Sequence, residues 1–298
     1  MSQTTVVRTD TGESLQELAA RHGLASAGAL PSLPQYVKQL WAYRHFITSY
    51  ANARVSSTLG VTHLGAIWTV LTPLFNAAVY YLIFGVILNT KAGAGNFIAY
   101  LCCGVFIYNF TSITISAGTQ SITANLGLIR ALHFPRASLP ISVVFVEVRN
   151  LLASMLVLIT IVLLTGEPIR WQWVLIVPAL FLQMLFNAGL AMFLARLGSK
   201  VLDIKNLIPF ILRIWMYLSA VLYPVTRFTH EFHGWHLKVI EANPLLVYIE
   251  LIRHALIADA VLANTPTQLW VEGLIWAVVL LSIGFTFFWR GEKGYGRG

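Results

Sequence analysis

Long stretches without a charged side chain are the feature that most constrains this sequence. No Asp, Glu, Lys or Arg occurs between Arg54 and Lys91, and none occurs between Lys91 and Arg130. A helix needs about 20 predominantly apolar residues to cross the hydrocarbon core of a bilayer. Only 11% of the 298 residues are charged, against roughly 25% in an ordinary soluble protein. We therefore expect an all-α integral membrane protein.

The apolar segments indicate six transmembrane helices. They are expected at about residues 66–88, 97–122, 140–164, 171–195, 207–222 and 271–289. Lys and Arg concentrate in the loops that six spans would place on one face, and cytoplasmic loops retain such residues. Residues 1–30 are polar and lack the apolar core of a signal peptide. We expect a flexible cytoplasmic segment at 1–30, a membrane domain at 31–290 and a cytoplasmic tail at 291–298.

Two segments do not match a simple six-helix pattern. Residues 33–50 place apolar side chains at helical spacing opposite Lys38 and Arg44, which predicts an amphipathic helix in the cytoplasmic interface. Asn243 and Pro244 form a helix-start signal before an apolar stretch that is too short to span the membrane. We expect a re-entrant helix there, on the outer face.

Three charged side chains fall inside expected spans beyond the first turn, where each costs at least about 2.5 kcal/mol at the bilayer centre. They are Glu147, Arg149 and Arg213. Glu147 and Arg213 are expected at similar depths, so we predict that they form an interhelical ion pair. A purely structural role in helix packing is an equally good interpretation.

Aromatic rings are dense in the first two expected spans. Most such rings pack against lipid or a neighbouring helix, but a path for sugars would also use their flat apolar faces. The candidates for a channel lining are Tyr80, Tyr81, Phe84, Phe106, Tyr108 and Phe110.

Several kinds of chemistry are missing from the sequence. There is no G-x-x-x-x-G-K-[ST] phosphate loop, so a separate subunit would have to bind any ATP that drives this chain. There is no G-x-S-x-G motif, and the basic residues form no nucleic-acid-binding patch. His230, His233 and His236 could ligate zinc, but Gly234 interrupts the helix that would align them, so no metal site is predicted. The sequence therefore gives no indication of hydrolytic or glycosyl-transfer chemistry.

Four stretches of the sequence resemble the membrane subunits of ABC-2-type exporters, in particular the permeases that export O-antigen and other lipid-linked polysaccharides. They cover most of residues 33–290. The stretches are 54–60 with 65–68 and 71–74, 125–130 with 134–136 and 139–140, 203–204 with 209–210, 217–219 and 223–224, and 243–245 with Arg253. The stretch from 125 to 140 is the most specific of the four. The chain differs from many relatives at Ser219-Ala220, where they have Ser-Pro.

The resemblance implies the fold of this exporter type: a homodimer with two copies of an ABC nucleotide-binding subunit, which would bind ATP and Mg²⁺. It implies that 33–50 is an interface helix, and that outer gate helices occupy 223–258. It also implies a bacterial plasma membrane location with both termini in the cytoplasm.

The resemblance also implies roles for particular residues. Coupling to the ATPase would involve Asn125, Leu128, Arg130, His133, Phe134, Pro135 and Arg136. The diphosphate of a lipid-linked glycan would meet Arg44, Arg54 and Arg149 at the cytoplasmic entrance. The outer gate would include Tyr223, Pro224, Asn243, Pro244 and Arg253.

The exported material is not decided by the residues. We expect a polyprenyl-diphosphate-linked polysaccharide, either an O-antigen or a cell-wall galactan. Of these two, the basic C-terminal tail slightly favours the galactan. Teichoic acid, capsule, a drug or a small lipid are alternatives for the same type of exporter. A membrane-embedded transferase acting on lipid-linked sugars is the alternative from another class.

Overall fold

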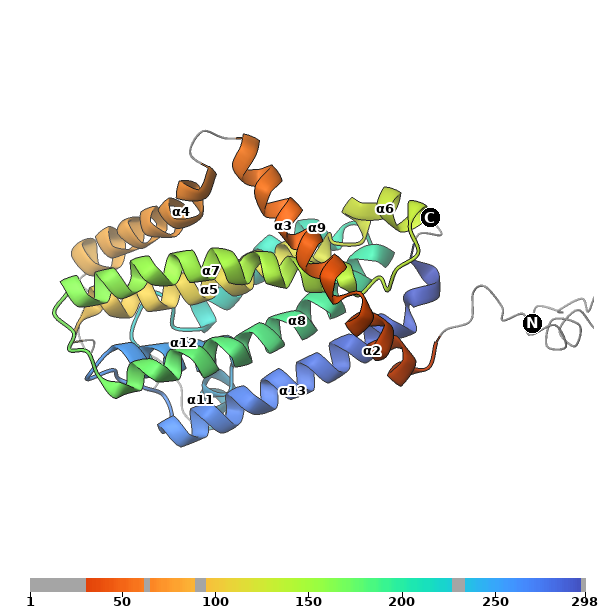
Figure 1. The fold of residues 1–298 in the computed structure, drawn as a ribbon. Helices are drawn as coiled ribbons and strands as arrows, with labels where there is room; N and C mark the ends of the chain where they lie inside the picture. Colours follow the sequence, from red (N-terminus) through yellow and green to blue (C-terminus); the bar gives the residue numbers. More distant parts are fainter. Residues whose placement is uncertain (1–30, 62–64, 89–94, 227–233, 296–298) are drawn as a thin grey trace, which may run out of the picture.

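The computed structural model describes residues 31–61, 65–88, 95–226 and 234–295. These residues form an elongated bundle of helices, and no strand occurs among them (Figure 1). The expected all-helical fold is confirmed. The N-terminal segment expected at 1–30 lies outside the described residues.

Within the described residues, five of the six expected spans correspond to helical segments that are long and apolar enough to cross a membrane. They are α4 (Gly65–Tyr80) with its π-helical continuation (Tyr81–Ile87), α5 (Phe97–Thr119), α7 (Ser138–Leu164), α8 (Ile176–Lys200) with the preceding 3₁₀ turn (Trp171–Leu175), and α13 (Pro266–Arg290). Each helix satisfies its backbone hydrogen bonds internally, as a segment in the hydrocarbon core of a bilayer must.

The span expected at 207–222 is only partly helical. Helix α9 (Ile204–Leu218) has 15 residues, which corresponds to about 22 Å, shorter than a bilayer core. The chain then turns at Ala220, whose φ of 46° is left-handed. The described residues that follow form the short helices α11 (Trp235–Glu241) and α12 (Pro244–Leu256). The apolar run in the sequence therefore extends beyond the helix that it contains.

The amphipathic helix expected at 33–50 is divided into two. Helix α2 (Leu33–Ala42) ends at Tyr43, and α3 (Arg44–Val61) continues in a new direction (Figure 1). Tyr36 and Ile47 are buried, whereas Trp41 is 71% exposed. The two helices thus bind the bundle with some of their apolar side chains and leave others on the surface.

Helices α8 and α13 approach each other more closely than any side chain would allow. A Cβ added to Gly284 would lie 1.9 Å from the backbone oxygen of Gly189 on the facing helix. Small residues at such a crossing let two backbones make extensive van der Waals contact without a side chain between them. This pair of glycines sets the spacing of α8 and α13 at their crossing.

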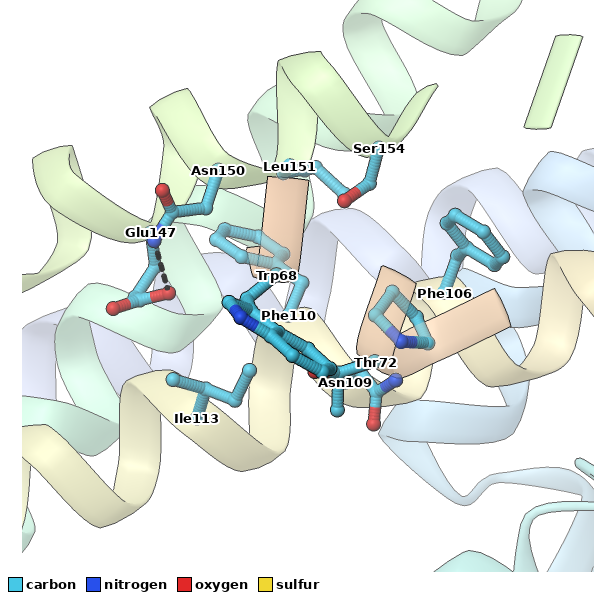
Figure 2. A pocket seen from close by; sticks show the side chains of 11 residues that line it. Trp68, Thr72, Phe106, Asn109, Phe110, Ile113, Glu147, Asn150, Leu151 and Ser154 are labelled. Atoms are coloured by element: carbon cyan, nitrogen blue, oxygen red, sulfur yellow. Dashed lines mark hydrogen bonds between the residues drawn. The ribbon is translucent and has the colours of Figure 1, made fainter. Parts of the chain in front are cut away.

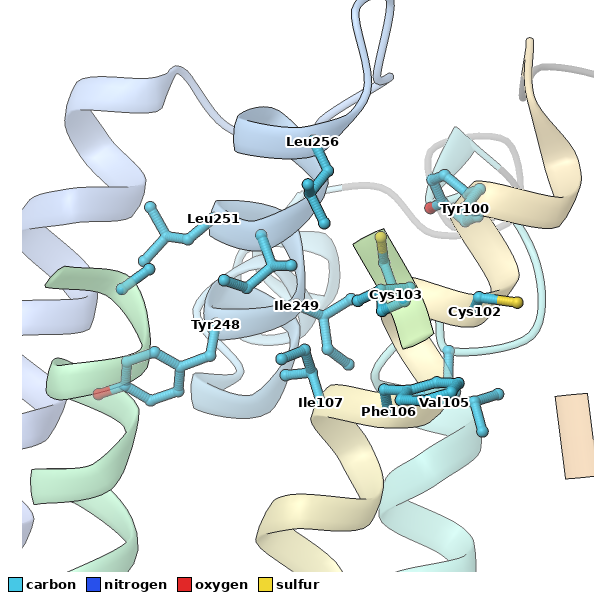
Figure 3. Close-up of a cluster of buried hydrophobic side chains, with 14 of the residues drawn as sticks. Tyr100, Cys102, Cys103, Val105, Phe106, Ile107, Tyr248, Ile249, Leu251 and Leu256 are labelled. Carbon is cyan, nitrogen blue, oxygen red and sulfur yellow. The ribbon is translucent and has the colours of Figure 1, made fainter. Parts of the chain in front are cut away.

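The main core surrounds α5, which is the most buried of the spanning helices. Its Cys103 and Ile107 are fully buried and share this core with Ile249 of α12, which lies beside Cys103 (Figure 3). Helix α12 is itself almost entirely enclosed. A 13-residue helix that is too short to span the bundle is therefore held inside one end of it.

Candidate functional site

The segment expected to couple to an ATPase lies at one end of the bundle. It consists of a 3₁₀ turn (Thr123–Asn125), α6 (Leu126–Ala131) and the loop that leads into α7. Helix α2 and the C-terminal end of α13 lie at the same end (Figure 1). Arg130 and His133 are exposed there, while Leu128 is half-buried and Pro135 is buried. The segment thus exposes polar side chains on its outer side, while Leu128 and Pro135 pack against the bundle.

A buried carboxylate connects this segment to helix α2 and to the residues that follow α13. Glu292 accepts hydrogen bonds from the Tyr36 hydroxyl at 2.8 Å and from the Arg136 backbone N–H at 2.9 Å. The Arg136 guanidinium donates to the Glu292 carbonyl and lies 3.9 Å from its carboxylate. Burial raises the pKa of Glu292, although these donors and the Arg136 charge act in the opposite direction.

Helix α3 contacts the same segment through its aromatic residues. The Tyr50 hydroxyl donates to the Asn125 side chain, and the Tyr43 hydroxyl donates to the His133 carbonyl at 3.2 Å. The rings of Phe46 and Phe134 lie 4.9 Å apart. A displacement of the segment would therefore be transmitted to α3 through packed rings and hydrogen bonds.

The expected ion pair between Glu147 and Arg213 is not formed within the chain. Glu147 accepts a hydrogen bond from Asn150 at 3.1 Å, and the cation in its electrostatic range is Arg54. Arg213 instead lies in the range of Tyr80 and Tyr108. Helix α9 packs on α5, which places Arg213 away from the face of α7 that carries Glu147.

The three arginines expected at the cytoplasmic entrance are all exposed. Arg149 of α7 donates to the Asn52 side chain of α3. Arg54 lies 6.0 Å from the centre of the Tyr50 ring, and Arg44 lies 5.5 Å from that of Trp41. Arg54 and Arg149 therefore belong to one polar surface between α3 and α7, and Arg44 lies two turns or more away along the chain.

The six expected channel aromatics separate into distinct groups. Phe106 and Phe110 line a pocket between α4, α5 and α7. The Tyr108 hydroxyl donates to the Leu212 carbonyl of α9 at 3.1 Å, and Tyr80 also faces α9. The ring of Tyr81 packs against Phe97, and Phe84 packs against the main core. All six rings belong to the main core or pack against it, but they contact different neighbouring helices.

Two polar side chains organise the end of the bundle that contains α12. The Arg253 side chain is fully buried and donates to the carbonyls of Tyr100 at 3.2 Å and Ala220 at 2.9 Å. Asn243 caps α12 by accepting from Leu245 N–H, and its amide donates to the Ser219 hydroxyl at 2.9 Å. Both residues thus bind the backbone where α9 ends.

Three further residues from the sequence predictions can be placed at that end. The hydroxyl of Tyr223 donates to the Tyr217 carbonyl, Pro224 is buried and Pro244 begins α12. His230 and His233 lie outside the described residues, and no cluster of three metal-ligating side chains occurs within them.

Sequence reasoning missed the roles of Tyr36 and Glu292. The sequence signal for Glu292 is a single acid in a basic tail, next to Arg290 and Lys293, which is ordinarily a solvated residue. Only the approach of residues 36, 136 and 292 reveals that the acid is buried and paired.

Comparison with known proteins shows what the chain is similar to. Residues 48–257 match the family described as ABC-2 type transporter. An O-antigen export system permease protein RfbA of Myxococcus xanthus is 25% identical over 195 residues, which cover 65% of this chain and 74% of the relative. A protein of the same name from Klebsiella pneumoniae is 25% identical over 221 residues, covering 74% and 83%. The chain therefore belongs to the ABC-2 type transporter family.

Proposed function

We propose that this chain is the membrane subunit of an ATP-driven exporter that moves a lipid-linked polysaccharide from the cytoplasm to the outer face of a bacterial plasma membrane. The observation that carries the proposal is the similarity to O-antigen export permeases over most of the chain. The polysaccharide would be an O-antigen or a cell-wall galactan on a polyprenyl diphosphate. The reaction is transport, with no covalent change in the cargo.

ATP hydrolysis belongs to a separate subunit in this proposal. Two copies of the chain would form the membrane part, with the segment 207–222 making the sixth crossing and both termini in the cytoplasm. Two ABC nucleotide-binding subunits would hold ATP and Mg²⁺ and would dock on residues 123–137. The contacts from Phe134 to Phe46 and from Asn125 to Tyr50 support this assignment, because they connect the docking segment directly to α3.

Depletion of the chain in its native organism tests the transport function. We expect lipid-linked glycan to accumulate on the cytoplasmic side and surface glycan to fall. An exporter of drugs or small lipids would leave both pools unchanged. A transferase would change the structure of the lipid-linked glycan instead of its location. Either of these results would contradict the proposal.

Substitution of Phe134 tests the coupling assignment. Phe134→Ala should leave the subunit folded and inserted in the membrane, but it should uncouple ATP hydrolysis from glycan export. Phe181→Ala on α8, whose ring is 54% exposed, is the matched control and should transport normally. Normal export by Phe134→Ala would remove the coupling role from this segment.

A further inference from the structure

A pocket of about 330 Å³ lies between α4, α5 and α7, inside the apolar part of the bundle (Figure 2). On α7 it extends from about 14 to about 24 Å beyond the start of the helix at Ser138, at 1.5 Å per residue. Its volume falls in the range of about 300–1,000 Å³ that is typical of small-molecule sites. The residues that matter here are Trp68, Phe106, Asn109, Phe110, Glu147 and Ser154.

Polar side chains from two helices converge on this pocket. Asn109 of α5 and Ser154 and Glu147 of α7 all line it. One oxygen of Glu147 accepts from Asn150 at 3.1 Å, which leaves the other oxygen available. Glu147 and Ser154 are only 9% and 8% exposed. Polar groups are costly in hydrocarbon unless they are hydrogen-bonded, so these side chains favour an occupant that forms hydrogen bonds.

Aromatic rings form the other walls of the pocket. Phe106 and Phe110 are buried on α5, and Trp68 approaches them from α4 (Figure 2). A lipid chain would match these rings but would leave the amide, hydroxyl and carboxylate unpaired. A sugar matches both kinds of surface, because its C–H face packs on an aromatic ring while its hydroxyls donate and accept hydrogen bonds.

Charge argues against the diphosphate end of a lipid-linked glycan as the occupant. Among the described residues that line the pocket, Glu147 is the charged one and none is Lys or Arg. A phosphate would meet this acid with no cation in the lining itself, whereas a neutral sugar hydroxyl would donate to it. The pocket therefore suits the carbohydrate part of such a molecule.

We propose that this pocket is a sugar-binding site within the membrane, which holds a sugar unit of the exported glycan against Trp68. Asn109, Ser154 and the available oxygen of Glu147 are its hydrogen-bonding groups. The inference rests on the proposed transport function and specifies where in the subunit the glycan is recognised.

Saturation-transfer NMR on the full chain in lipid nanodiscs, free of glycoside detergents, tests the site. The probes are the methyl glycosides of glucose, galactose, mannose and rhamnose. We expect wild-type protein to bind at least one of them, and Asn109→Leu and Trp68→Leu to weaken that binding about tenfold. Trp171→Leu, which removes an exposed ring outside the pocket, should bind like wild type.

The two substitutions lie on different helices, so a folding defect in one variant leaves the other as a test. Trp68→Phe keeps a ring at the same place and should retain most of the binding. Absence of saturation transfer with wild-type protein would overturn the proposal and indicate that water or lipid fills the pocket. Equal binding by wild type and both leucine variants would overturn it as well.

The pocket and the transport function can fail separately. Glycan that accumulates on depletion, combined with no glycoside binding, would overturn the pocket and leave the exporter. Glycoside binding lost in both leucine variants, combined with unchanged surface glycan on depletion, would support the pocket and overturn the exporter.

Discussion

The Tyr36 hydroxyl donates to the buried Glu292 carboxylate at 2.8 Å, which connects two residues that are 256 positions apart. The same hydroxyl accepts the backbone N–H of Ala137 at 3.1 Å. One phenol therefore holds together helix α2, the loop that precedes α7, and the C-terminal tail. Because this loop ends the segment that we assign to the ATPase, the tail contributes to the position of the docking surface.

Removal of that hydroxyl should destabilise the folded subunit. Tyr36→Phe leaves a buried carboxylate oxygen and a backbone N–H without this partner. We therefore expect the free energy of unfolding to fall by about 1–3 kcal/mol. Thermal denaturation of the purified subunit would measure it. Tyr43→Phe removes an exposed hydroxyl bonded to His133 and is the control, with little expected change. Equal denaturation midpoints for the two variants would show that the buried contact contributes nothing.

Glu292 should make stability depend on pH. Burial raises its pKa above the ordinary 4.5, so the folded chain binds this proton more tightly than the unfolded chain does. The contribution of Glu292 to stability is then greatest below pH 4.5 and is lost as the pH rises from 4.5 through the raised value. Glu292→Gln has no such proton to release. As the pH rises through this interval, the thermal denaturation midpoint of Glu292→Gln should fall less than that of wild type. Parallel midpoint-against-pH curves for the two proteins would contradict the role of Glu292.

The crossing of α8 and α13 should not tolerate a larger residue. A Cβ at Gly284 would lie 1.9 Å from the oxygen of Gly189, so Gly284→Ala forces the two helices apart. We expect the free energy of unfolding to fall by about 1–3 kcal/mol and the yield of folded protein to decrease. Gly127→Ala is the matched control, since nothing lies within 4 Å of its added Cβ. Fluorescence size-exclusion chromatography compares the two, and similar folded fractions would count against the close approach.

Arg253 should be necessary for the end of the bundle that contains α12. Arg253→Leu leaves the carbonyls of Tyr100 and Ala220 without their charged donor, and hydrogen bonds to charged groups contribute about 1.5–3 kcal/mol each. Arg253→Lys should recover only part of the loss, because a single ammonium cannot reproduce the planar fork. Lys238→Leu, on the exposed surface of α11, should be neutral. A thermal midpoint for Arg253→Leu equal to that of Lys238→Leu would refute this role.

Exchange of the two intramembrane charges should give no rescue. Glu147 contacts Asn150 and faces Arg54, whereas Arg213 lies near Tyr80 and Tyr108. We therefore expect the combination of Glu147→Arg and Arg213→Glu to be at least as harmful to folded yield as the worse single change. A double variant that recovers wild-type yield would demonstrate a direct pair and contradict the geometry.

The sequence determined where the five long spans lie because lipid imposes a local requirement. Each span must satisfy its own backbone and present mostly apolar side chains, so long apolar runs such as 66–88 indicate where these five spans lie. The amphipathic stretch at 33–50 was found for a similar reason. Its division at Tyr43 was not, since no Gly or Pro marks that position.

Only the tertiary structure decided which polar groups meet, because their partners are distant in sequence. The apolar run of 207–222 predicts one more span, but Arg253 binds the carbonyls of Ala220 and Val221, and α9 ends before them. Depth along a helix suggested Glu147 as the partner of Arg213, yet pairing also depends on which faces are adjacent. That information lies in the packing of α9 against α5, and hydropathy, which is a property of each segment by itself, does not contain it.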